Sequence, residues 1–292
     1  MSERKVKIRL GIDIGGTAIK AVALDSSLSI LETYQTSSFA KQEGEEGVHR
    51  ALKTVMERFQ GFDVESAGIG CAGSVDHANG IVINSPNFAH WKNVGLRAWF
   101  TETFSVPCKI DNDANCAVVA EWKLGVARGY DYVVLLTLGT GVGGGLILAG
   151  EVYRGTHGAA AELGHFSIKA DGKLCNCGNR GCFELYCSAT TLRNQFPEHS
   201  AKQIIQRREQ EPYKSAIASF IENLITGITS IANVFDPQLV VIGGGIMNGM
   251  GWALADIERS VKERAFPAIA KDIRVVSAEH ANWAGALGAA LL

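Results

Sequence analysis

Residues 6–25 read VKIRLGIDIGGTAIKAVALD, and this stretch decides the fold. Apolar residues alternate with other residues from Val6 to Ile14, a period of two that predicts a strand ending at Gly15-Gly16. Residues 18–25 and 28–36 have the composition of two more strands. The stretch therefore predicts a three-stranded meander with a glycine loop after its first strand.

The second half of the chain repeats this opening. DYVVLLTLGTG, residues 131–141, predicts a buried strand that runs into glycines, and two further strands are predicted at 144–150 and 151–156. A long apolar helix at 213–235 precedes another buried strand, PQLVVIGGG, at 237–245. This order predicts an α/β fold of two related lobes.

The lobes are assigned by where the pattern restarts. We place a smaller lobe at residues 1–115 and a larger lobe at 116–280. A helix at about residues 281–292, rich in alanine and leucine, is expected to pack back on the smaller lobe.

Composition excludes several classes of protein. The 292 residues are 47% hydrophobic and 20% charged, which is globular composition, and the net charge of −2 favours neither nucleic acid nor an acidic membrane. The apolar runs are too short to cross a bilayer, and the start of the sequence has no signal-peptide pattern. Seven cysteines, an odd number, argue against a disulfide scaffold. We expect a cytoplasmic protein.

Three glycine clusters follow apolar strands. Glycine lets backbone N–H groups approach a ligand closely, and phosphate is the ligand that such loops hold most often. The alternative is tight turns in a glycine-rich fold. The clusters are Gly15-Gly16-Thr17, Gly139-Thr140-Gly141 and Gly243-Gly244-Gly245.

Polar side chains accompany two of these clusters. Asp13 precedes the first one, and a carboxylate beside a phosphate loop is a ligand for Mg²⁺. Lys20 is either a phosphate contact or an ordinary surface lysine. The segment from Thr137 to Gly141 offers hydroxyls and backbone donors for a second phosphate contact.

Two other nucleotide motifs do not fit. Gly139, Gly141 and Gly144 match GxGxxG, but the dinucleotide version of that motif has to open a helix, and here a strand is predicted to follow. The P-loop pattern GxxxxGK[ST] is absent from the sequence.

A polar cluster lies where a predicted strand meets a helix, in KIDNDANCAVVAE at residues 109–121. Asp113 could serve as the N-cap of that helix. Asp111, Asn112 and Asn115 make the cluster larger than a cap requires. An aspartate here could instead accept the proton of an alcohol that attacks a phosphate, with Asn112 holding another hydroxyl.

The stretch LCNCGNRGCFE at residues 174–184 is the most unusual in the chain. Together with His165 it supplies the Cys₃His set of a structural zinc shell in Cys175, Cys177 and Cys182. Four protein ligands close the shell, so the zinc would not act as a Lewis acid. We treat residues 165–184 as a zinc-binding insert of the larger lobe.

Two glutamates are tied to this insert. Glu162 lies three residues before His165, and Glu184 lies two residues after Cys182. They are either ligand-binding groups positioned by the metal or ordinary surface charges. His165 could bind zinc through one ring nitrogen and present the other to a ligand.

These motifs together resemble the ROK family (repressors, open reading frames, kinases), and specifically its hexokinases, over essentially the whole chain. The resemblance rests on D-x-G-G-T at 13–17, Asn112-Asp113, G-T-G-x-G-G-G at 139–145, E-x-G-H at 162–165 and C-x-C-G-x-x-G-C-x-E at 175–184. It implies a two-lobed, actin-like (ribonuclease H-like) α/β fold that closes on ATP–Mg²⁺ and a sugar, with the active site in the cleft between the lobes. It also implies a structural Zn²⁺ and a homodimer.

The resemblance assigns roles to individual residues. It implies that Asp113 is the base for the sugar 6-hydroxyl. Residues implied to bind the sugar are Gly73, Asn87, Asn112, Asp113, Glu162, His165 and Glu184. Residues implied to bind the nucleotide and its metal are Asp13, Gly15, Gly16, Thr17, Lys20, Thr137, Gly139, Thr140, Gly141, Gly243, Gly244 and Gly245.

Three positions depart from the family pattern on the presumed sugar side. Ala161 replaces a usual glycine, Ala72 a common proline, and Ala189 a common glycine. They leave the reaction in place but weaken the choice of sugar. We therefore expect an ATP-dependent hexose kinase acting on glucose, with allose or N-acetylmannosamine as alternatives.

A sugar-responsive regulator without kinase activity is the alternative from another class. Such regulators carry an N-terminal helix-turn-helix, and the first strand is predicted to begin by about Val6. We expect a hexose and ATP as partners, and no nucleic acid or membrane.

Overall fold

The computed structural model describes residues 5–85, 88, 91–280 and 282–292 and divides into two compact units. Unit 1 comprises residues 1–123, 154–160 and 283–292, and unit 2 comprises 124–153 and 161–282. The division falls after Lys123, whereas the sequence analysis put it after residue 115. The final helix belongs to unit 1.

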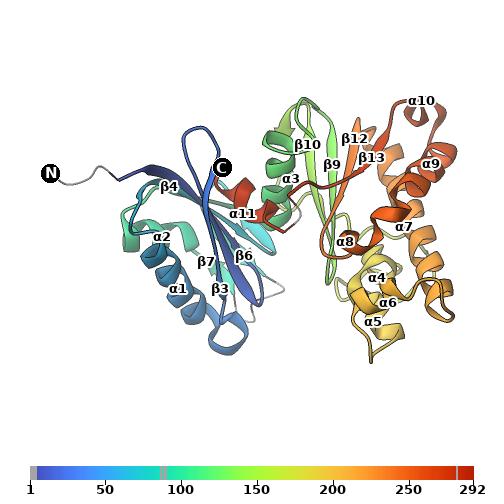
Figure 1. Cartoon of the computed structure of the whole chain (residues 1–292), viewed down its shortest axis with the longest axis horizontal. Coiled ribbons are helices and arrows are strands. Elements are labelled where there is room, and N and C mark those ends of the chain that lie inside the picture. The colour runs from blue at the N-terminus through green and yellow to red at the C-terminus, as the bar shows by residue number, and fades with distance from the viewer. Residues whose placement is uncertain (1–4, 86–87, 89–90, 281) are drawn as a thin grey trace. The chain divides into compact units, whose positions relative to one another are not determined.

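Unit 1 is built on a five-stranded sheet (Figure 1). The first three strands form the expected antiparallel meander, and the other two run parallel to β1. The strands in spatial order are β3 (Ile30–Ser37), β2 (Ala18–Leu24), β1 (Lys7–Ile14), β4 (Asp63–Cys71) and β8 (Cys108–Asn112). A second, three-stranded sheet contains β5 (Ser74–Asp76), β6 (Ile81–Asn84) and β7 (Lys92–Val94).

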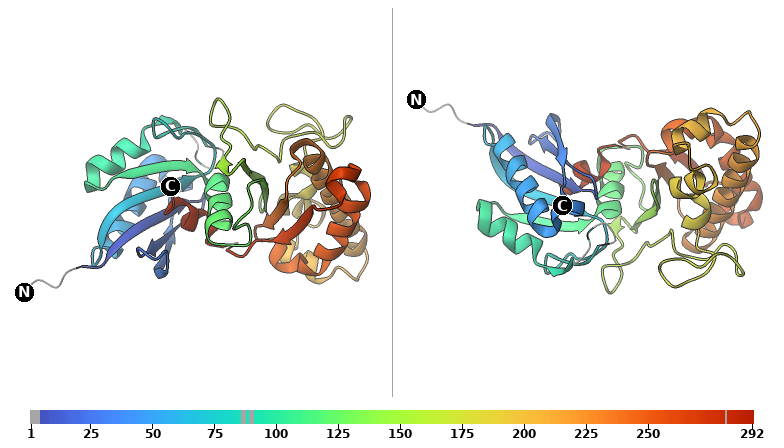
Figure 2. Two further views of the ribbon diagram at one scale, coloured as in Figure 1. Left: turned by 90° about the horizontal axis from the view of Figure 1, so that it is seen from above. Right: turned by 90° about the horizontal axis from the view of Figure 1, so that it is seen from below.

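Helices cover both faces of the first sheet. Leu10 and Ile12 of β1 share an apolar cluster with α1 (Ala40–Arg58) and α2 (Leu96–Phe104). Side chains alternate along a strand, so Gly11 points to the opposite face, where it meets α11 (Ala284–Ala289). There α11 lies against α3 (Asp113–Lys123), as both views of Figure 2 show in red and green.

Unit 2 repeats the same sheet order with different strands, which confirms the predicted α/β fold class. Its first three strands are again antiparallel neighbours, and β12 and β13 continue the sheet in parallel. The strands in spatial order are β11 (Glu151–Val152), β10 (Val142–Leu148), β9 (Val133–Leu138), β12 (Leu239–Gly243) and β13 (Arg274–Ser277).

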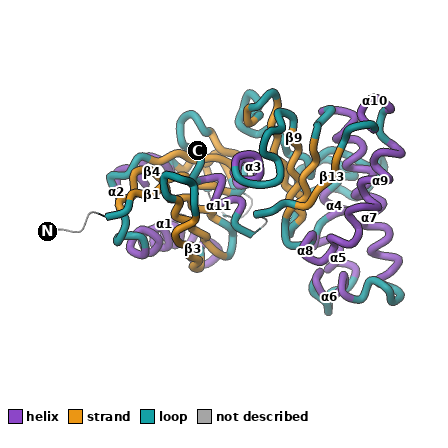
Figure 3. The backbone as a smooth tube through the Cα atoms, turned by 45° about the horizontal axis from the view of Figure 1, so that its top comes forward, coloured by secondary structure: helices purple, strands orange, loops and turns teal. Residues whose placement is uncertain are grey.

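Most helices of unit 2 gather beside this sheet, as the purple segments of Figure 3 show. Only the longest of them, α7 (Tyr213–Phe235), was predicted. The others are α4 (Glu184–Cys187), α5 (Ala189–Gln195), α6 (Ala201–Gln206), α8 (Met247–Met250), a 3₁₀ turn at Gly251–Ala253, α9 (Leu254–Arg264) and α10 (Pro267–Ala270).

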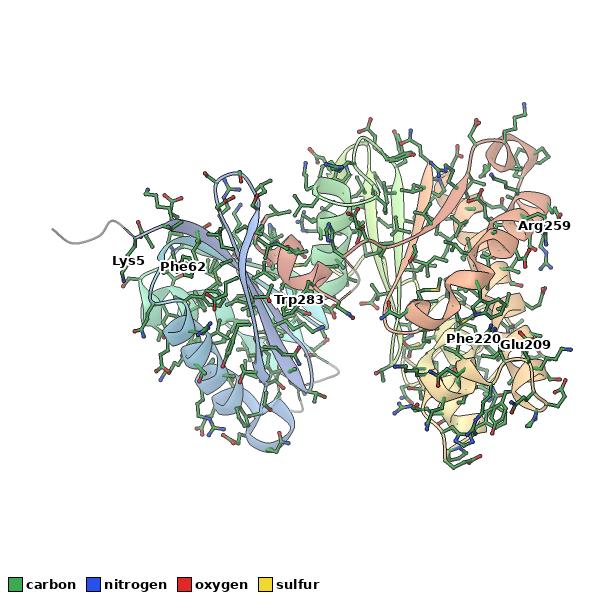
Figure 4. The ribbon with its side chains drawn as sticks, in the orientation of Figure 1. Lys5, Phe62, Glu209, Phe220, Arg259 and Trp283 are labelled. Atoms are coloured by element: carbon green, nitrogen blue, oxygen red, sulfur yellow. The ribbon has the colours of Figure 1, made fainter. Side chains whose placement is uncertain are left out.

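Helix α7 is long and apolar enough to cross a membrane by length and composition alone. In the structure, Phe220, Leu224 and Ile228 are buried in the core of unit 2 together with Val240 of β12. Figure 4 labels Phe220 on this helix. The apolar composition of α7 is therefore accounted for by its packing within the unit.

Candidate active site

Two aspartates lie at the ends of β1 and β8, the two strands that flank β4 in the sheet of unit 1. Asp13 of β1 is level with Gly70 of β4, and Gly70 is level with Asp111 of β8. Asp113 follows β8 directly and begins α3. Because these strands are parallel, their carboxyl ends bring Asp13 and Asp113 to the same edge of the sheet.

The helix cap is made by Asn112. Its Oδ1 accepts hydrogen bonds from the backbone N–H groups of Ala114 at 2.8 Å and Asn115 at 3.2 Å, and its Nδ2 donates to the carbonyl of Gly73 at 3.0 Å. The carboxylate of Asp113 accepts a 3.0 Å bond from Ala114 N–H. Capping, the alternative use of Asp113, is thus already provided by its neighbour.

The surroundings of the two carboxyl groups raise both pKa values. The pKa of Asp13 is raised to about 7, chiefly by desolvation and also by the negative charge of Asp113, with Lys20 opposing the change. Burial also raises the pKa of Asp113, against hydrogen bonds from Ala114 and Asn112. The two carboxylates form a donor set that suits a divalent cation, because a bound cation would offset the repulsion between their negative charges. Lys20 lies nearby but is not itself a metal ligand.

This pKa shift predicts a pH-dependent stability. Between about pH 4 and 7 the folded state binds a proton at Asp13 that the unfolded chain has released. Without divalent cations, the free energy of unfolding should therefore fall as pH rises through that window, by at most about 1.4 kcal/mol per pH unit, and level off above it. In the Asp13→Asn variant, most of this pH-dependent decrease in the free energy of unfolding should be absent.

Urea unfolding of both proteins at pH 5 and pH 8 in chelator measures the effect. An Asp13→Asn variant whose stability falls with pH as steeply as that of the wild type would contradict the assignment.

The two other glycine clusters share an edge of the sheet in unit 2. Gly243 at the end of β12 is level with Thr137 of β9, and both strands run in the same direction. The backbone of Gly244 lies against that of Leu138. The residues after Gly141 continue as β10 and not as a helix, which agrees with the exclusion of a dinucleotide motif.

Glu184 forms a hydrogen bond beside the second glycine cluster. Its Oε2 accepts a 2.8 Å hydrogen bond from Val142 N–H, and it lies where a side chain on residue 141 would stand. Only glycine at position 141 leaves room for this contact. Ala189 N–H donates to the Gly139 carbonyl at 2.8 Å, so the start of α5 supports the same loop.

The four predicted zinc ligands come together. The ligand atoms of His165, Cys175, Cys177 and Cys182 all lie within 4.8 Å of one another. Cys175 Sγ is 3.7 Å from His165 Nδ1, and Cys177 Sγ is 3.6 Å from Cys182 Sγ. These separations fit a tetrahedral ion, for which bonds of about 2.3 Å to sulfur place two sulfur atoms about 3.8 Å apart.

The thiols of this cluster differ in acidity. Desolvation and its cysteine neighbours raise the pKa of Cys182 to about 12, whereas a backbone hydrogen bond from Asn179 lowers the pKa of Cys177. A zinc ligand has to be a thiolate, and a bound cation would stabilise that form at each sulfur atom. Since Nδ1 of His165 faces the sulfur atoms, Nε2 is the nitrogen left for another partner.

Residues 161–165 form a turn between β11 and the zinc cluster. Leu163 N–H donates to the Ala161 carbonyl at 2.6 Å, and His165 N–H donates to the Glu162 carbonyl at 2.9 Å. Ala161 has φ of 64°, a left-handed conformation that favours glycine. Glu162 is exposed, and Gly164 packs closely on the backbone of Val142.

The conformation of Ala161 predicts that Ala161→Gly increases stability by about 1 kcal/mol. Urea unfolding measures the change. The matched control is Ala160→Gly, because Ala160 is not among the residues of positive φ, so glycine there should be neutral or destabilising. Equal effects at both positions would show that the strain is absent.

The predicted site residues therefore fall into two groups, one in each unit. Unit 1 holds Asp13, the first glycine cluster, Lys20, Gly73, Asn112 and Asp113, and unit 2 holds the other glycine clusters, Glu162, His165 and Glu184. Asn87 lies outside the described residues. Sequence reasoning missed Arg154, whose guanidinium pairs with Asp111 in unit 1; a single arginine in EVYRGT gives no sequence signal.

Comparison with known proteins identifies relatives over the full length. The ROK family model matches residues 9–292. A glucokinase of Thermotoga maritima is 31% identical, with 98% of this chain and 96% of that protein covered. The xylose repressor of Bacillus subtilis is 27% identical over 98% of this chain and 76% of its own length.

A solved structure shares the fold at similar identity. It is a ROK family glucokinase from Streptomyces griseus in complex with glucose and AMPPNP, and it is 32% identical with a TM-score of 0.82. The match covers 97% of this chain and 98% of that one.

Proposed function

The chain belongs to the ROK family, and from this premise we propose that it transfers the γ-phosphoryl group of ATP to the 6-hydroxyl of a hexose, with glucose as the preferred sugar. Glucokinases of about this length, 31% and 32% identical over nearly the whole chain, support the choice of reaction. Its fold is the actin-like α/β fold of the ROK kinases.

The observation that carries the proposal is the position and the environment of Asp113. It is a half-buried carboxylate with a raised pKa at the first residue of α3, beside Asp13 and released from capping by Asn112. A base of raised pKa is better matched to an alcohol proton at neutral pH than an ordinary surface aspartate.

In the proposed reaction, Asp113 accepts the proton of the 6-hydroxyl as its oxygen attacks the γ-phosphorus. The bond from phosphorus to the bridging oxygen breaks, and ADP leaves with the electron pair. Asn112 orients Asp113 through its side-chain hydrogen bond. Mg²⁺ held at Asp13 would offset phosphate charge.

We assign the sugar hydroxyls to Asn112, Glu162, His165 and Glu184, with Gly73 and Asn87 beside them. The glycine clusters, Thr137 and Lys20 are assigned to the phosphates. Zn²⁺ at His165, Cys175, Cys177 and Cys182 is assigned a structural role, because four protein ligands complete its shell.

A coupled assay of ADP release tests the function. Glucose, mannose, allose, N-acetylmannosamine and N-acetylglucosamine are supplied with ATP and Mg²⁺, and glucose should give the highest kcat/KM. A higher value for allose or N-acetylmannosamine would move the assignment to that sugar. Release of ADP with none of them, together with specific DNA binding in a shift assay, would favour the regulator alternative.

We further propose that the enzyme is a cytoplasmic homodimer. The family resemblance supports both parts of this statement. Light scattering of the purified protein, with and without glucose, measures the assembly.

A further inference from the structure

Asp111 is a buried carboxylate that the proposed reaction does not use. Its side chain is 2% exposed, and it lies two residues before Asp113 at the end of β8. It does not cap α3, since Asn112 does so. Charged side chains are rarely fully buried unless they are paired, and Asp111 is paired with hydrogen-bond donors among the described residues.

Each oxygen of Asp111 has two donors. Oδ1 accepts hydrogen bonds from Asn112 N–H at 2.8 Å and Asn115 Nδ2 at 2.9 Å. Oδ2 accepts from Nε of Arg154 at 2.8 Å, and Nη2 of the same guanidinium is 2.7 Å away. His77 Nδ1 lies 3.7 Å from Oδ2 but 2.7 Å from the carbonyl of Ile110.

Arg154 comes from a part of the chain remote from β8. The segment Arg154–Ala160 belongs to unit 1 although the residues on both sides of it belong to unit 2. Its ends are joined, because Ala160 N–H donates to the Arg154 carbonyl at 3.1 Å. Gly158 lies so close to the carbonyl of Val75 that a side chain would clash. The backbone that carries Arg154 is therefore held in place.

From this geometry we propose that Arg154 is a positioning residue for Asp113 and acts through Asp111. The guanidinium compensates the buried negative charge, and the compensated carboxylate holds Asn112 N–H and the Asn115 side chain in the first turn of α3. That turn carries Asp113. Without Arg154, the buried charge of Asp111 is uncompensated, and the side chain must turn toward water, which releases its hydrogen bonds to the turn.

The inference rests on the proposed kinase function, and kinetics of Arg154→Ala test it. A displacement of about 1 Å at a reacting group can cost 10²-fold in rate. We expect kcat to fall by about 10–100-fold, while the KM values for glucose and ATP change by less than about threefold, because Asp113 acts in the chemical step.

Chemical rescue separates positioning from general structural damage. Guanidinium chloride at millimolar concentration, matched in ionic strength by NaCl controls, should restore at least a tenth of the lost rate in Arg154→Ala. It should restore nothing in Asp113→Asn. Arg58→Ala is the matched control, because Arg58 pairs with Glu32 on the same unit at 2.6 Å, and its kcat should stay at the wild-type value.

A second variant keeps the proposal testable if Arg154→Ala does not fold. Asp111→Asn keeps the shape of the side chain but removes the charge that Arg154 compensates, and its kcat should fall at least about tenfold. A folded Arg154→Ala or Asp111→Asn with kcat within twofold of wild type would overturn the proposal. So would a loss in Arg154→Ala that guanidinium does not reverse.

Hydrogen exchange distinguishes this inference from the proposed function itself. The amides of Asn112 and Asn115 should exchange at least tenfold faster in Arg154→Ala and recover with guanidinium, whether or not any sugar is phosphorylated. Wild-type protein that phosphorylates no sugar refutes the function alone. Unchanged exchange at these amides refutes the link from Arg154 to the turn.

Discussion

Asp113→Asn is expected to lower kcat by about 10²–10⁴-fold while glucose still binds. Asparagine has nearly the same volume, and its Oδ1 can still accept the hydrogen bond that Asp113 accepts from Ala114 N–H. The cap made by Asn112 is untouched. What is lost is the group that takes the proton of the attacking hydroxyl.

ADP release measures kcat, and titration calorimetry measures glucose affinity. The matched control is Asp63→Asn, an exposed aspartate at the start of β4 in the same sheet, which should keep wild-type kcat. The pKa of Asp13 should also drop below its value of about 7 in Asp113→Asn, because the neighbouring charge that raises it is gone. Near-native kcat in Asp113→Asn would refute the assignment of the base.

Removal of zinc is expected to weaken glucose binding by at least about tenfold, or about 1.4 kcal/mol, and to leave nucleotide affinity within a few-fold. The physical reason is that the residues proposed to bind the sugar are close in the chain to the metal ligands and hydrogen-bonded to the same segment. Glu184 follows Cys182 by two residues, and its backbone N–H donates to the Gly164 carbonyl at 2.9 Å. His165 is itself a ligand.

The measurement is glucose and AMPPNP titration before and after verified chelation, followed by zinc add-back. Cys187→Ser is a useful control, because Cys187, the last residue of α4, is buried and is not among the four clustered ligands, so the zinc content of this variant should stay at the wild-type level. Unchanged glucose affinity in verified zinc-free protein would show that the cluster does not position these residues.

Local patterns predicted much of both units. The alternation in residues 6–14 became β1, the buried strand predicted within residues 131–141 is β9, and the long helix was predicted at Tyr213–Phe235, where α7 lies. These elements are visible in the sequence because each places its apolar side chains at its own period on one buried face. The helices α4, α5, α6, α8 and α10, of four to seven residues, have too few turns to show such a period. Helix α9 is long enough, with Ile257 and Val261 buried one turn apart, and it was missed.

Covalent spacing likewise predicted the zinc ligands. Three of the four lie within eight residues, so the chain between them can reach only a few arrangements, and the structure brings them together with His165. Asp13 was found because it lies at the end of an apolar strand, and Asp113 because it follows one. By itself, then, the sequence determined most of the strands, the long helix, the set of four possible metal ligands and the two aspartates.

Only the tertiary structure decided how these groups are held. It assigned the cap of α3 to Asn112 and not to Asp113, and it attached Glu184 to the backbone of Val142. It also paired Asp111 with Arg154, a residue 43 positions away in the chain. Such contacts join segments that meet only after the sheet has formed, so no period or spacing along the chain encodes them, and they depend on the register of strands that pair across long loops.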